Sequence, residues 1–426
     1  MKYEMMHPAD KLVLMMSRVY LNRMTSTSGG NLSIIDENGD IWITPSGYDK
    51  GSLTRADIMC IRADGKVIGP HKPSMEFPFH QSVYRMRPDI KTVFHAHPPA
   101  VITFSLVRKI PHVELIPEVL QLCGRIVMAP YAVPGSTKLG DYISEKFKDG
   151  YNTVEMENHG ICIGTEDIFK SYRIFEALEN FAKIELNALR LGPLDDSSVL
   201  SCGASSFPAY GTFKRQAPGA EESAVRRDLI SYIHRACRQH LFTSAQGTYS
   251  AVLSDGSFII TPADKDREWL EVQDLVRVKD GRCEEGKIPG STAYFHGLVY
   301  SRHSDIKSIT CSLPPNMGAF TISGTLFDPR LIPETYMVLV DMKTVLRTDF
   351  FMAPAKTAAL FEKSCPVLLV KNTCLVTTGP TIVKAFDRME VADYAAESVI
   401  AARALGSIVH IDGSDITDLD KAFDLK

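Results

Sequence analysis

Two histidines separated by one residue could hold a metal ion from a single strand. His95 and His97 close an apolar stretch, residues 89–94, that has the character of a buried strand. Because side chains alternate along a strand, residues two apart lie on the same face and can approach one ion. A third imidazole, His159, precedes a glycine at an expected turn between two strands. Three neutral histidines with an open coordination position are typical of a catalytic zinc site rather than a structural one.

A carboxylate lies upstream of these histidines. Glu76 ends the sequence Pro73-Ser74-Met75-Glu76, at the start of an expected helix that Ser74 could cap. There a carboxylate could either complete the metal's ligands or act as a general base beside it. Both roles stay open at this point, and both make Glu76 the candidate catalytic residue.

The two halves of the chain resemble each other, so each candidate residue can be compared with the residue at the matching position of the other half. Ile43-Thr44-Pro45 returns as Ile260-Thr261-Pro262, and Asn158 returns as Asn372. Self-similarity at this long spacing indicates tandem domains rather than a solenoid. We predict a first domain over residues 1–192, a linker rich in Ser, Pro and Gly over 193–221, and a second domain over 222–412.

The second copy lacks the candidate site residues. In order, Glu76, His95, His97 and His159 correspond to Thr292, Cys311, Leu313 and Thr373. The neighbouring His80 and Tyr84 persist as His296 and Tyr300. An isolated pair of histidines is more often a surface or core feature than a metal site. The joint loss of four residues from a preserved framework favours a site, confined to the first domain.

Small polar clusters before the histidines could bind an anion. Asn31 follows two glycines, Ser46 and Gly47 follow Thr44-Pro45, and Ser74 opens the expected helix. Glycine-rich turns and helix N-termini expose backbone N–H groups that suit phosphate. Taken singly, each cluster is more often an ordinary turn. In the second half Asp264 stands where Gly47 stands in the first, and an aspartate there would repel a phosphate.

The apolar periodicity predicts a similar order of elements in each copy. In the first copy we expect these elements: a helix around Leu12–Val19, strands at 32–35 and 41–43, a helix from near Ser74 to before Pro88, strands at 91–97, 154–157 and 161–163, and a helix over 167–191. Hairpins mixed with helices indicate a mostly antiparallel sheet covered by helices.

Composition narrows the classes of protein that remain. The chain has 426 residues, a net charge of −4 and nine cysteines without a C-x-x-C pair. No basic stripe indicates a nucleic-acid partner, and no polybasic tail or long apolar run indicates a membrane partner or a signal peptide. Scattered cysteines in apolar segments are typical of reduced thiols, so we expect a cytoplasmic location.

These motifs resemble the class II aldolase/adducin family. The resemblance covers about residues 8–192 and rests on Gly29-Gly30-Asn31-Leu32-Ser33, Ile43-Thr44-Pro45-Ser46-Gly47, Pro73-Ser74-Met75-Glu76, His95-Ala96-His97 and Asn158-His159-Gly160. It implies an α/β/α three-layer sandwich with a mainly antiparallel sheet, here written twice. It also implies one Zn²⁺ per chain, held by His95, His97 and His159, with Glu76 as the acid/base. Asn31, Ser46, Gly47 and Ser74 would then hold the substrate's phosphate.

The resemblance implies reversible cleavage of a ketose 1-phosphate, or a related sugar, to dihydroxyacetone phosphate and an aldehyde through a zinc-stabilised enediolate. Two departures bear on the substrate and the proton donor. Met75 stands where the family often has a second serine, and Leu115 stands near the place of a tyrosine that some family aldolases use as a proton donor. Another divalent ion is an alternative to zinc.

Three other functions remain compatible with the resemblance. The same fold carries sugar-phosphate 4-epimerases, decarboxylases and adducin-like scaffolds without enzymatic activity. The epimerases tend to carry an aspartate where Glu76 stands, which favours cleavage here. Family enzymes are commonly fourfold rings, so we expect a homo-oligomer, either a dimer that forms a pseudo-fourfold ring or a higher assembly.

Overall fold

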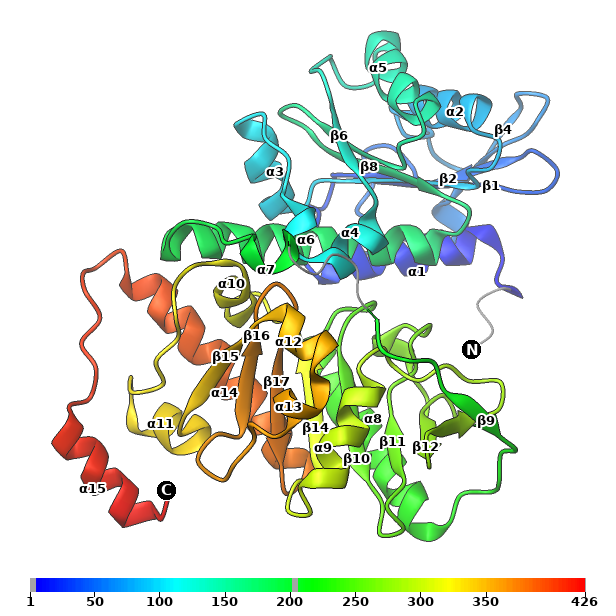
Figure 1. The fold of residues 1–426 in the computed structure, drawn as a ribbon. Coiled ribbons are helices and arrows are strands. Elements are labelled where there is room, and N and C mark those ends of the chain that lie inside the picture. The colour runs from blue at the N-terminus through cyan, green and yellow to red at the C-terminus, as the bar shows by residue number, and fades with distance from the viewer. Residues whose placement is uncertain (1–4, 201–205, 426) are drawn as a thin grey trace. The chain divides into compact units, whose positions relative to one another are not determined.

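The protein forms two compact units. A computed structural model describes residues 5–200 and 206–425, and Figure 1 traces this chain from its N-terminal to its C-terminal end. One unit is built from the chain up to Val113 together with Val119–Ala182. The other contains Glu114–Glu118 and everything from Lys183 onward. The cuts fall between helices α3 (Pro99–Leu106) and α4 (Pro117–Cys123), inside α4, and inside the long helix α6 (Ile168–Leu191). The boundaries predicted at residues 192 and 222 stay predictions.

The first unit is an eight-stranded sheet with helices on both faces. Its strands lie in the order β4-β3-β2-β1-β5-β8-β7-β6, and every neighbouring pair is antiparallel except β6 with β7. The elements are α1 (Pro8–Leu21), β1 (Asn31–Ile35), β2 (Ile41–Ile43), β3 (Met59–Ile61), β4 (Val67–Ile68), α2 (Phe77–Met86), β5 (Thr92–Ala96), α3 (Pro99–Leu106), α4 (Pro117–Cys123), β6 (Ile126–Ala129), α5 (Thr137–Lys148), β7 (Thr153–Met156), β8 (Gly160–Thr165) and α6 (Ile168–Leu191).

The helices of this unit form two layers around the sheet. Figure 1 shows α2 and α5 on one face and α1 and α6 on the other. Helix α5 buries Leu139, Ile143 and Phe147, which recur every fourth residue and therefore lie on one side of the helix. On the opposite face, Phe175 of α6 packs on Phe94 of β5, with ring centroids 4.9 Å apart. The predicted three-layer sandwich with a mainly antiparallel sheet is confirmed.

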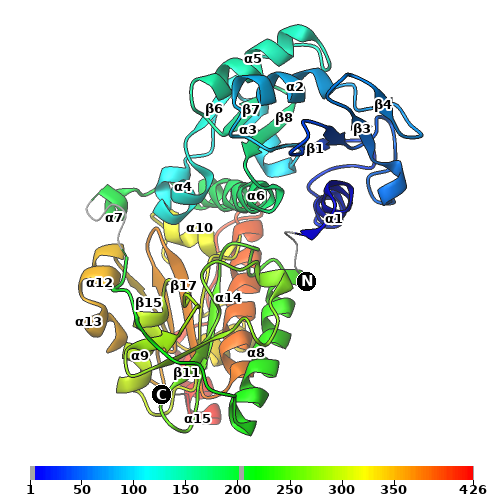
Figure 2. The same cartoon turned by 90° about the vertical axis from the view of Figure 1, so that its right-hand side faces the viewer.

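The second unit repeats the same sheet order. Its nine strands run β15-β16-β17-β14-β10-β11-β12-β13-β9, which is the order of the first unit with one strand added beside β13. Figure 2 shows α9, α12 and α13 on one face of this sheet and α8 and α14 on the other. The strands are β9 (Gly211–Phe213), β10 (Thr248–Val252), β11 (Phe258–Ile260), β12 (Val276–Lys279), β13 (Arg282–Glu284), β14 (Ser308–Ser312), β15 (Met342–Val345), β16 (Val367–Val370) and β17 (Cys374–Gly379). The helices are α7 (Ser197–Leu200), α8 (Ala220–Arg238), α9 (Ala293–Arg302), α10 (Met317–Ile322), α11 (Pro333–Leu339), α12 (Arg347–Met352), α13 (Pro354–Ala358), α14 (Ile382–Ala402) and α15 (Gly413–Phe423).

The segment predicted as a linker holds regular structure of its own. Strand β9 pairs in parallel with β13, and the amide of Asp195 donates to the carbonyl of Ile322 at 2.8 Å. The Ser, Pro and Gly content predicted a linker over residues 193–221, and that stays a prediction. Strand β9 pairs with the backbone groups that the edge strand β13 leaves open.

Two local expectations around the site need correction. Helix α2 begins at Phe77 with Glu76 as its N-cap, so Ser74 does not cap it. Instead the Ser74 hydroxyl accepts a hydrogen bond from the amide of Glu76 at 3.2 Å, in a turn that precedes the helix. Strand β5 ends at Ala96, one residue before His97, because the chain must turn into Pro98 and Pro99.

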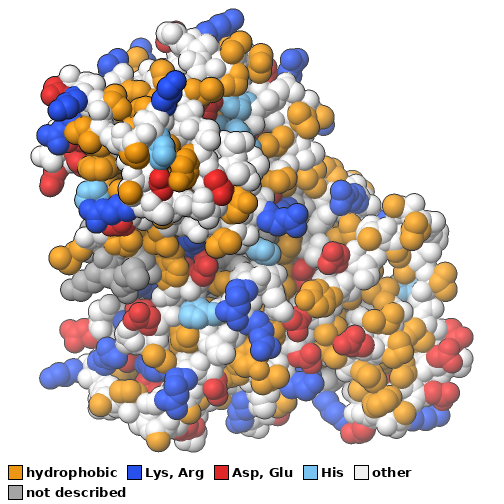
Figure 3. Space-filling view, turned by 180° about the vertical axis from the view of Figure 1, so that it is seen from behind, with side chains coloured by type: hydrophobic (Ala, Val, Ile, Leu, Met, Phe, Trp, Pro, Cys, Tyr) orange, Lys and Arg blue, Asp and Glu red, His pale blue; other side chains and the backbone are white. Residues whose placement is uncertain are grey.

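The surface has mixed charge where it can be seen. In Figure 3, basic and acidic side chains are interspersed over the visible face, with apolar side chains between them. Within residues 5–200 and 206–425, no helix combines the length and apolarity needed to cross a bilayer.

Candidate metal centre

The register of the central strands places His95 beside Asn31. In the sheet, His95 of β5 lies directly opposite Asn31 of β1 and opposite Cys162 of β8. Directly paired residues share a face of an antiparallel sheet, so the side chains of Asn31 and His95 project the same way. His97 follows one residue past the strand and stays on that side, with its ring centroid 4.8 Å from that of His95.

A tight turn brings the third histidine to the same place. The turn between β7 and β8 contains Asn158 at a φ of 52°, a left-handed conformation that asparagine tolerates better than most residues. It carries His159 back over the sheet, with ring centroids 4.9 Å from His95 and 5.3 Å from His97. The structure therefore unites residues from β5 and from the β7–β8 turn, more than sixty positions apart in the sequence.

The three imidazoles present nitrogen atoms that fit one divalent ion. One nitrogen from each of His95, His97 and His159 lies within 4.8 Å of the others. The Nδ1–H of His95 donates to the carbonyl of Ile161 at 2.9 Å, which leaves its Nε2 with a lone pair. That Nε2 lies 3.1 Å from Nε2 of His97, a distance at which two protonated nitrogens would repel each other. Imidazole nitrogens that converge in this way could hold one divalent ion.

Glycines make room for these rings. A Cβ added at Gly160 would lie 2.7 Å from Cδ2 of His97 and 2.6 Å from the carbonyl oxygen of Ala96. A Cβ at Gly29 would lie 2.8 Å from Nδ1 of His97. The histidine cluster is thus enclosed closely from two sides, and a side chain at either glycine would displace a ring.

Glu76 lies against two of the histidines. Its Oε2 is 3.2 Å from Nε2 of His95, and its Oε1 is 3.3 Å from Nε2 of His159. Oε2 also accepts a hydrogen bond of 2.7 Å from Nδ2 of Asn31. Within the described chain, Oε1 has no hydrogen-bond donor beyond its ion-pair contact with His159. One carboxylate oxygen is therefore held and the other is open toward the histidines.

A chain of hydrogen bonds orients Asn31. The hydroxyl of Tyr84 lies 2.6 Å from that of Ser33, and the Ser33 hydroxyl lies 2.7 Å from Nδ1 of His80. The Nε2 of His80 in turn contacts Oδ1 of Asn31. If Nδ1 accepts from Ser33, Nε2 carries the proton and donates to the amide oxygen. This fixes the Asn31 amide so that its NH₂ group faces Glu76.

Burial keeps His80, His97 and His159 uncharged, whereas Glu76 is ionised. Burial, together with the nearby His95, lowers the pKa of His97 to about 3 and that of His159 to about 4. Burial lowers the pKa of His80 to about 3 in the same way. Burial opposes ionisation of Glu76, but His95, His159 and Asn31 outweigh it and hold the pKa of Glu76 well below its usual range. Although burial lowers it, the pKa of His95 is raised by Glu76.

Two of the predicted anion-binding segments are joined by backbone pairing. Pro45 and Pro73 form an isolated β-bridge, and the amide of Ser46 donates to the carbonyl of Lys72 at 2.9 Å. This pairing joins the Ser46-Gly47 turn to the segment that contains Ser74, two residues before Glu76. Gly47 adopts a φ of 61°, the left-handed conformation for which a glycine is needed.

A buried lysine was missed by the sequence argument. Lys50 is 2% exposed, and its Nζ donates to the carbonyl of Pro45 at 2.7 Å. This bond stabilises the start of the Ser46-Gly47 turn. Burial lowers the pKa of Lys50 to about 8. The signal was present in the repeat, because Arg267 occupies the matching position of the second copy and binds the carbonyls of Ala263 and Lys265.

The backbone of the loop after β6 is bonded to the segment that contains His159. In the loop after β6, the amide of Tyr131 donates to Oε2 of Glu157 at 3.2 Å, two residues before His159. A Cβ at Gly135 in the same loop would lie 3.0 Å from the carbonyl of Met75, next to Glu76. Tyr131 is half exposed and was not singled out from the sequence.

Comparison with known proteins places this geometry in a family. The sequence model described as "Class II Aldolase and Adducin N-terminal domain" matches twice, over residues 10–186 and 227–400. The chain is 30% identical over 211 residues to a 5-deoxy-D-ribulose 1-phosphate aldolase from Bacillus thuringiensis, covering 47% of this chain and 96% of that protein. It is 29% identical over 161 residues to a 3-oxo-tetronate 4-phosphate decarboxylase from Pectobacterium atrosepticum, covering 37% of this chain and 73% of that protein. A solved structure of an L-fuculose 1-phosphate aldolase is 28% identical, covers 44% of this chain and 88% of that chain, and has a TM-score of 0.40.

Proposed function

Because this chain belongs to the class II aldolase and adducin family, we propose that it is a metal-dependent aldolase of sugar phosphates. The reaction would be reversible cleavage of a ketose 1-phosphate to dihydroxyacetone phosphate and an aldehyde. The observation that carries the proposal is the convergence of His95, His97 and His159 around one point, with the carboxylate of Glu76 in contact with two of them. The match to the 5-deoxy-D-ribulose 1-phosphate aldolase supports the same class of substrate.

His95, His97 and His159 would hold the ion. Three imidazoles suit Zn²⁺ best and also suit other divalent ions, so we propose zinc with that alternative. When bound, such an ion supplies Lewis-acid stabilisation of negative charge that develops on substrate oxygen. The hydrogen bond from His95 to the carbonyl of Ile161 would keep the ring turned toward the ion.

Glu76 would carry the proton. Its pKa is held low, so the carboxylate is ionised and can accept a proton from the carbon of the dihydroxyacetone half. Once His95 and His159 commit their Nε2 atoms to the ion, Oε2 keeps its bond to Asn31 while Oε1 loses its neighbour. We therefore assign the transferred proton to Oε1 and assign Asn31 the positioning of the carboxylate.

The phosphate group would be held by the turns beside the metal centre. Ser46, Gly47 and Ser74 offer hydroxyl and backbone donors on two segments joined by the Pro45–Pro73 bridge. Asn31 could contribute its second Nδ2 proton. Met75 is exposed where a further hydroxyl would strengthen this group, so a substrate of different shape is compatible with the site.

Decarboxylation is the second candidate, supported by the match to a 3-oxo-tetronate 4-phosphate decarboxylase. The same ion and the same carboxylate could serve either reaction, since both develop negative charge on oxygen next to the broken bond. The product that leaves distinguishes the two reactions, because cleavage releases an aldehyde and decarboxylation releases CO₂.

A product assay on the full chain loaded with Zn²⁺ tests the proposal. Ketose 1-phosphates should release dihydroxyacetone phosphate, detected by coupled reduction, and a 3-oxo acid phosphate should release no CO₂. Release of CO₂ alone would replace the aldolase by the decarboxylase, and a ketose isomer as the product would identify an epimerase. No turnover of either substrate, with no metal retained, would move the chain to the scaffolding members of the family.

Location and assembly are also proposed. The eight cysteines within the described residues are free thiols, which supports a reducing, cytoplasmic location. We propose a homo-oligomer, and light scattering of the tag-free protein would test it, with a monomeric mass as the contradicting result.

A further inference from the structure

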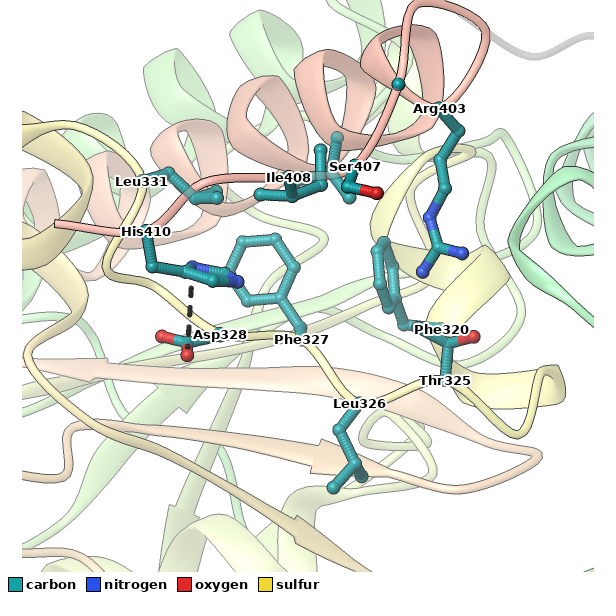
Figure 4. A pocket seen from close by; sticks show the side chains of 12 residues that line it. Phe320, Thr325, Leu326, Phe327, Asp328, Leu331, Arg403, Ser407, Ile408 and His410 are labelled. Carbon is teal, nitrogen blue, oxygen red and sulfur yellow. Dashed lines mark ion pairs between the residues drawn. The ribbon is translucent and has the colours of Figure 1, made fainter. Parts of the chain in front are cut away.

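The second unit contains a cavity that the proposed reaction does not use. It has a volume of about 550 Å³, within the range of small-molecule sites. Figure 4 shows it between the α10–α11 connection and the chain that follows α14. Phe320, Phe327, Leu331 and Ile408 form an apolar lining, and Arg403 joins them from the end of α14.

The outer wall of this cavity is anchored. It is formed by the segment between α14 and α15, and the amide of Ile411 at its end donates to the carbonyl of Arg330 at 2.9 Å. Helix α15 then continues the chain, and its Asp420 accepts a hydrogen bond of 2.8 Å from the hydroxyl of Tyr336. Because the end of the segment and helix α15 are both bonded to the unit, the outer wall of the cavity is held in place without a ligand.

The charges of the lining leave one cation without an acidic partner. Asp328 accepts hydrogen bonds from the backbone amide and the guanidinium of Arg330, at 2.5 to 3.1 Å, and lies 3.7 Å from Nδ1 of His410. Its charge is therefore already matched. No carboxylate among the described residues pairs with Arg403, and Figure 4 shows its guanidinium directed toward Phe320 and Thr325. A guanidinium presents several donors in a fixed plane, which suits a carboxylate or a phosphate.

The positions of the first copy that match this lining differ in charge. In the repeat, Arg403 corresponds to Leu189 and Asp328 to His112, whereas Phe320 corresponds to Phe104. The phenylalanine of the lining is therefore present in both copies, whereas the arginine is present only in the second. Loss of the histidines from the second copy coincides with gain of a charged cavity elsewhere in it.

We propose that this cavity is a binding site for a small organic anion, with a carboxylate or phosphate on an apolar, ring-sized body. Arg403 binds the anionic group, and Ser407 adds a hydroxyl to the lining, whereas the hydroxyl of Thr325 donates to the carbonyl of Leu191 at 3.1 Å. Phe327, Leu331 and Ile408 bury the apolar body. The site is separate from the metal centre and does not depend on the proposed reaction.

Calorimetric titration of the tag-free full chain tests the site. The probes are phenyl phosphate and benzoate, which share an aromatic body and differ in the anionic group, with phenol as the uncharged comparison. At least one of the two anions should bind with saturation, and phenol should bind at least about tenfold more weakly because it makes no charge-assisted hydrogen bonds. The stronger anion identifies which group Arg403 prefers.

Variants separate this site from the first copy, which could bind phenyl phosphate on its own. Arg403→Gln should remove one saturable site or weaken it at least about tenfold. Arg302→Gln removes the same charge from the exposed end of α9 and should leave binding unchanged. Leu326→Glu, at an exposed lining position, should weaken binding through repulsion without disturbing the core. Equal isotherms for R403Q and R302Q, or no saturable binding of either anion, would overturn the proposal.

Discussion

The same position in the two units has been built in two different ways. In the first, Asn31, Glu76 and His95 meet, with a bond of 2.7 Å between the amide and the carboxylate. In the second, the matching residues are Thr248, Thr292 and Cys311. The two threonine hydroxyls lie 2.6 Å apart, and the Cys311 thiol lies 3.2 Å from Nε2 of His296. Hydroxyls and a thiol fill the place of a charged cluster and satisfy one another.

The support behind this position is unchanged. Ser250 lies 2.7 Å from Nδ1 of His296 and 2.6 Å from the hydroxyl of Tyr300, the same distances that join Ser33 to His80 and Tyr84. The comparison teaches that the serine, histidine and tyrosine have a structural role that does not depend on the metal site. In the first copy the same framework also aims Asn31 at Glu76.

A second shared feature lies at the helix after the central strand. Glu179 accepts bonds from the amides of Ala100 and Val101 at the start of α3. Asp393 accepts bonds from the amides of Asn316 and Met317 at the start of α10. A carboxylate at a helix N-terminus satisfies backbone donors and the helix dipole, so it persists whether or not the copy has a metal site.

The largest effect should come from removing a histidine. His95→Ala should lower the turnover number by at least about a thousandfold, since Lewis-acid stabilisation is worth several kcal/mol. Elemental analysis should fall from about one divalent ion per chain to none. Cys311→Ala, at the matching position of the second copy, should keep both metal and activity. If the two variants lose metal equally, the site is not confined to the first copy.

Replacing the proposed proton carrier should separate chemistry from metal binding. Glu76→Gln should reduce the turnover number by about a hundred- to a thousandfold, the usual contribution of a general acid or base. The metal content should stay near that of the parent protein, because the three imidazoles remain. Thr292→Ala serves as the control in the second copy and should have parental activity. Loss of the ion from the glutamine variant would instead make Glu76 a fourth ligand.

Exchanging residues between the copies at one glycine should sharpen the contrast. Gly160→Cys introduces the residue found at Cys374, and its Cβ would lie 2.7 Å from His97 and 2.6 Å from a backbone oxygen. Metal affinity, measured by competition with a chelator, should fall about tenfold or more because ligand orientation is disturbed. The reverse change, Cys374→Gly, should leave metal affinity unaltered. An unchanged metal affinity in Gly160→Cys would contradict the close contact between Gly160 and the ring of His97.

The smallest effect concerns a buried carboxyl that only the first copy carries. Glu155 in β7 is fully buried, neither of its oxygens has a partner within the described chain, and burial raises its pKa from 4.5 to about 8. Between these pH values the folded chain holds a proton that the unfolded chain has released. The free energy of unfolding therefore falls as the pH rises through this window.

Glu155→Leu introduces the residue of the second copy, Leu369, and should remove that dependence. The variant should already be more stable than the parent at pH 4.5 by ~1–3 kcal/mol, the cost of a buried carboxyl without a partner, and the difference should grow as the pH rises to 8. Denaturant unfolding at both pH values measures the difference. Leu369→Glu should produce the opposite change. A parent protein that gains stability from pH 5 to pH 8 relative to Glu155→Leu would contradict this account.

The sequence predicted which residues form the site but not how they are arranged in space. The repeat singled out Glu76, His95, His97 and His159 because they vanish together, and the structure does bring them together. The order of helices and strands followed from apolar periodicity, which is a local property of the chain. The pairing of strand β9 with β13 did not follow from periodicity, because it joins segments far apart in the chain.

What the sequence by itself determined is which residues could do chemistry, and in which copy. Only the tertiary structure decided how they face one another. It placed the held oxygen of Glu76 toward Asn31, turned His95 by its bond to the carbonyl of Ile161, and opened a cavity around Arg403. The physical reason is that spacing along one element fixes only the face on which a side chain lies. Hydrogen bonds between elements far apart in the chain fix its orientation, and those depend on how strands and turns pack.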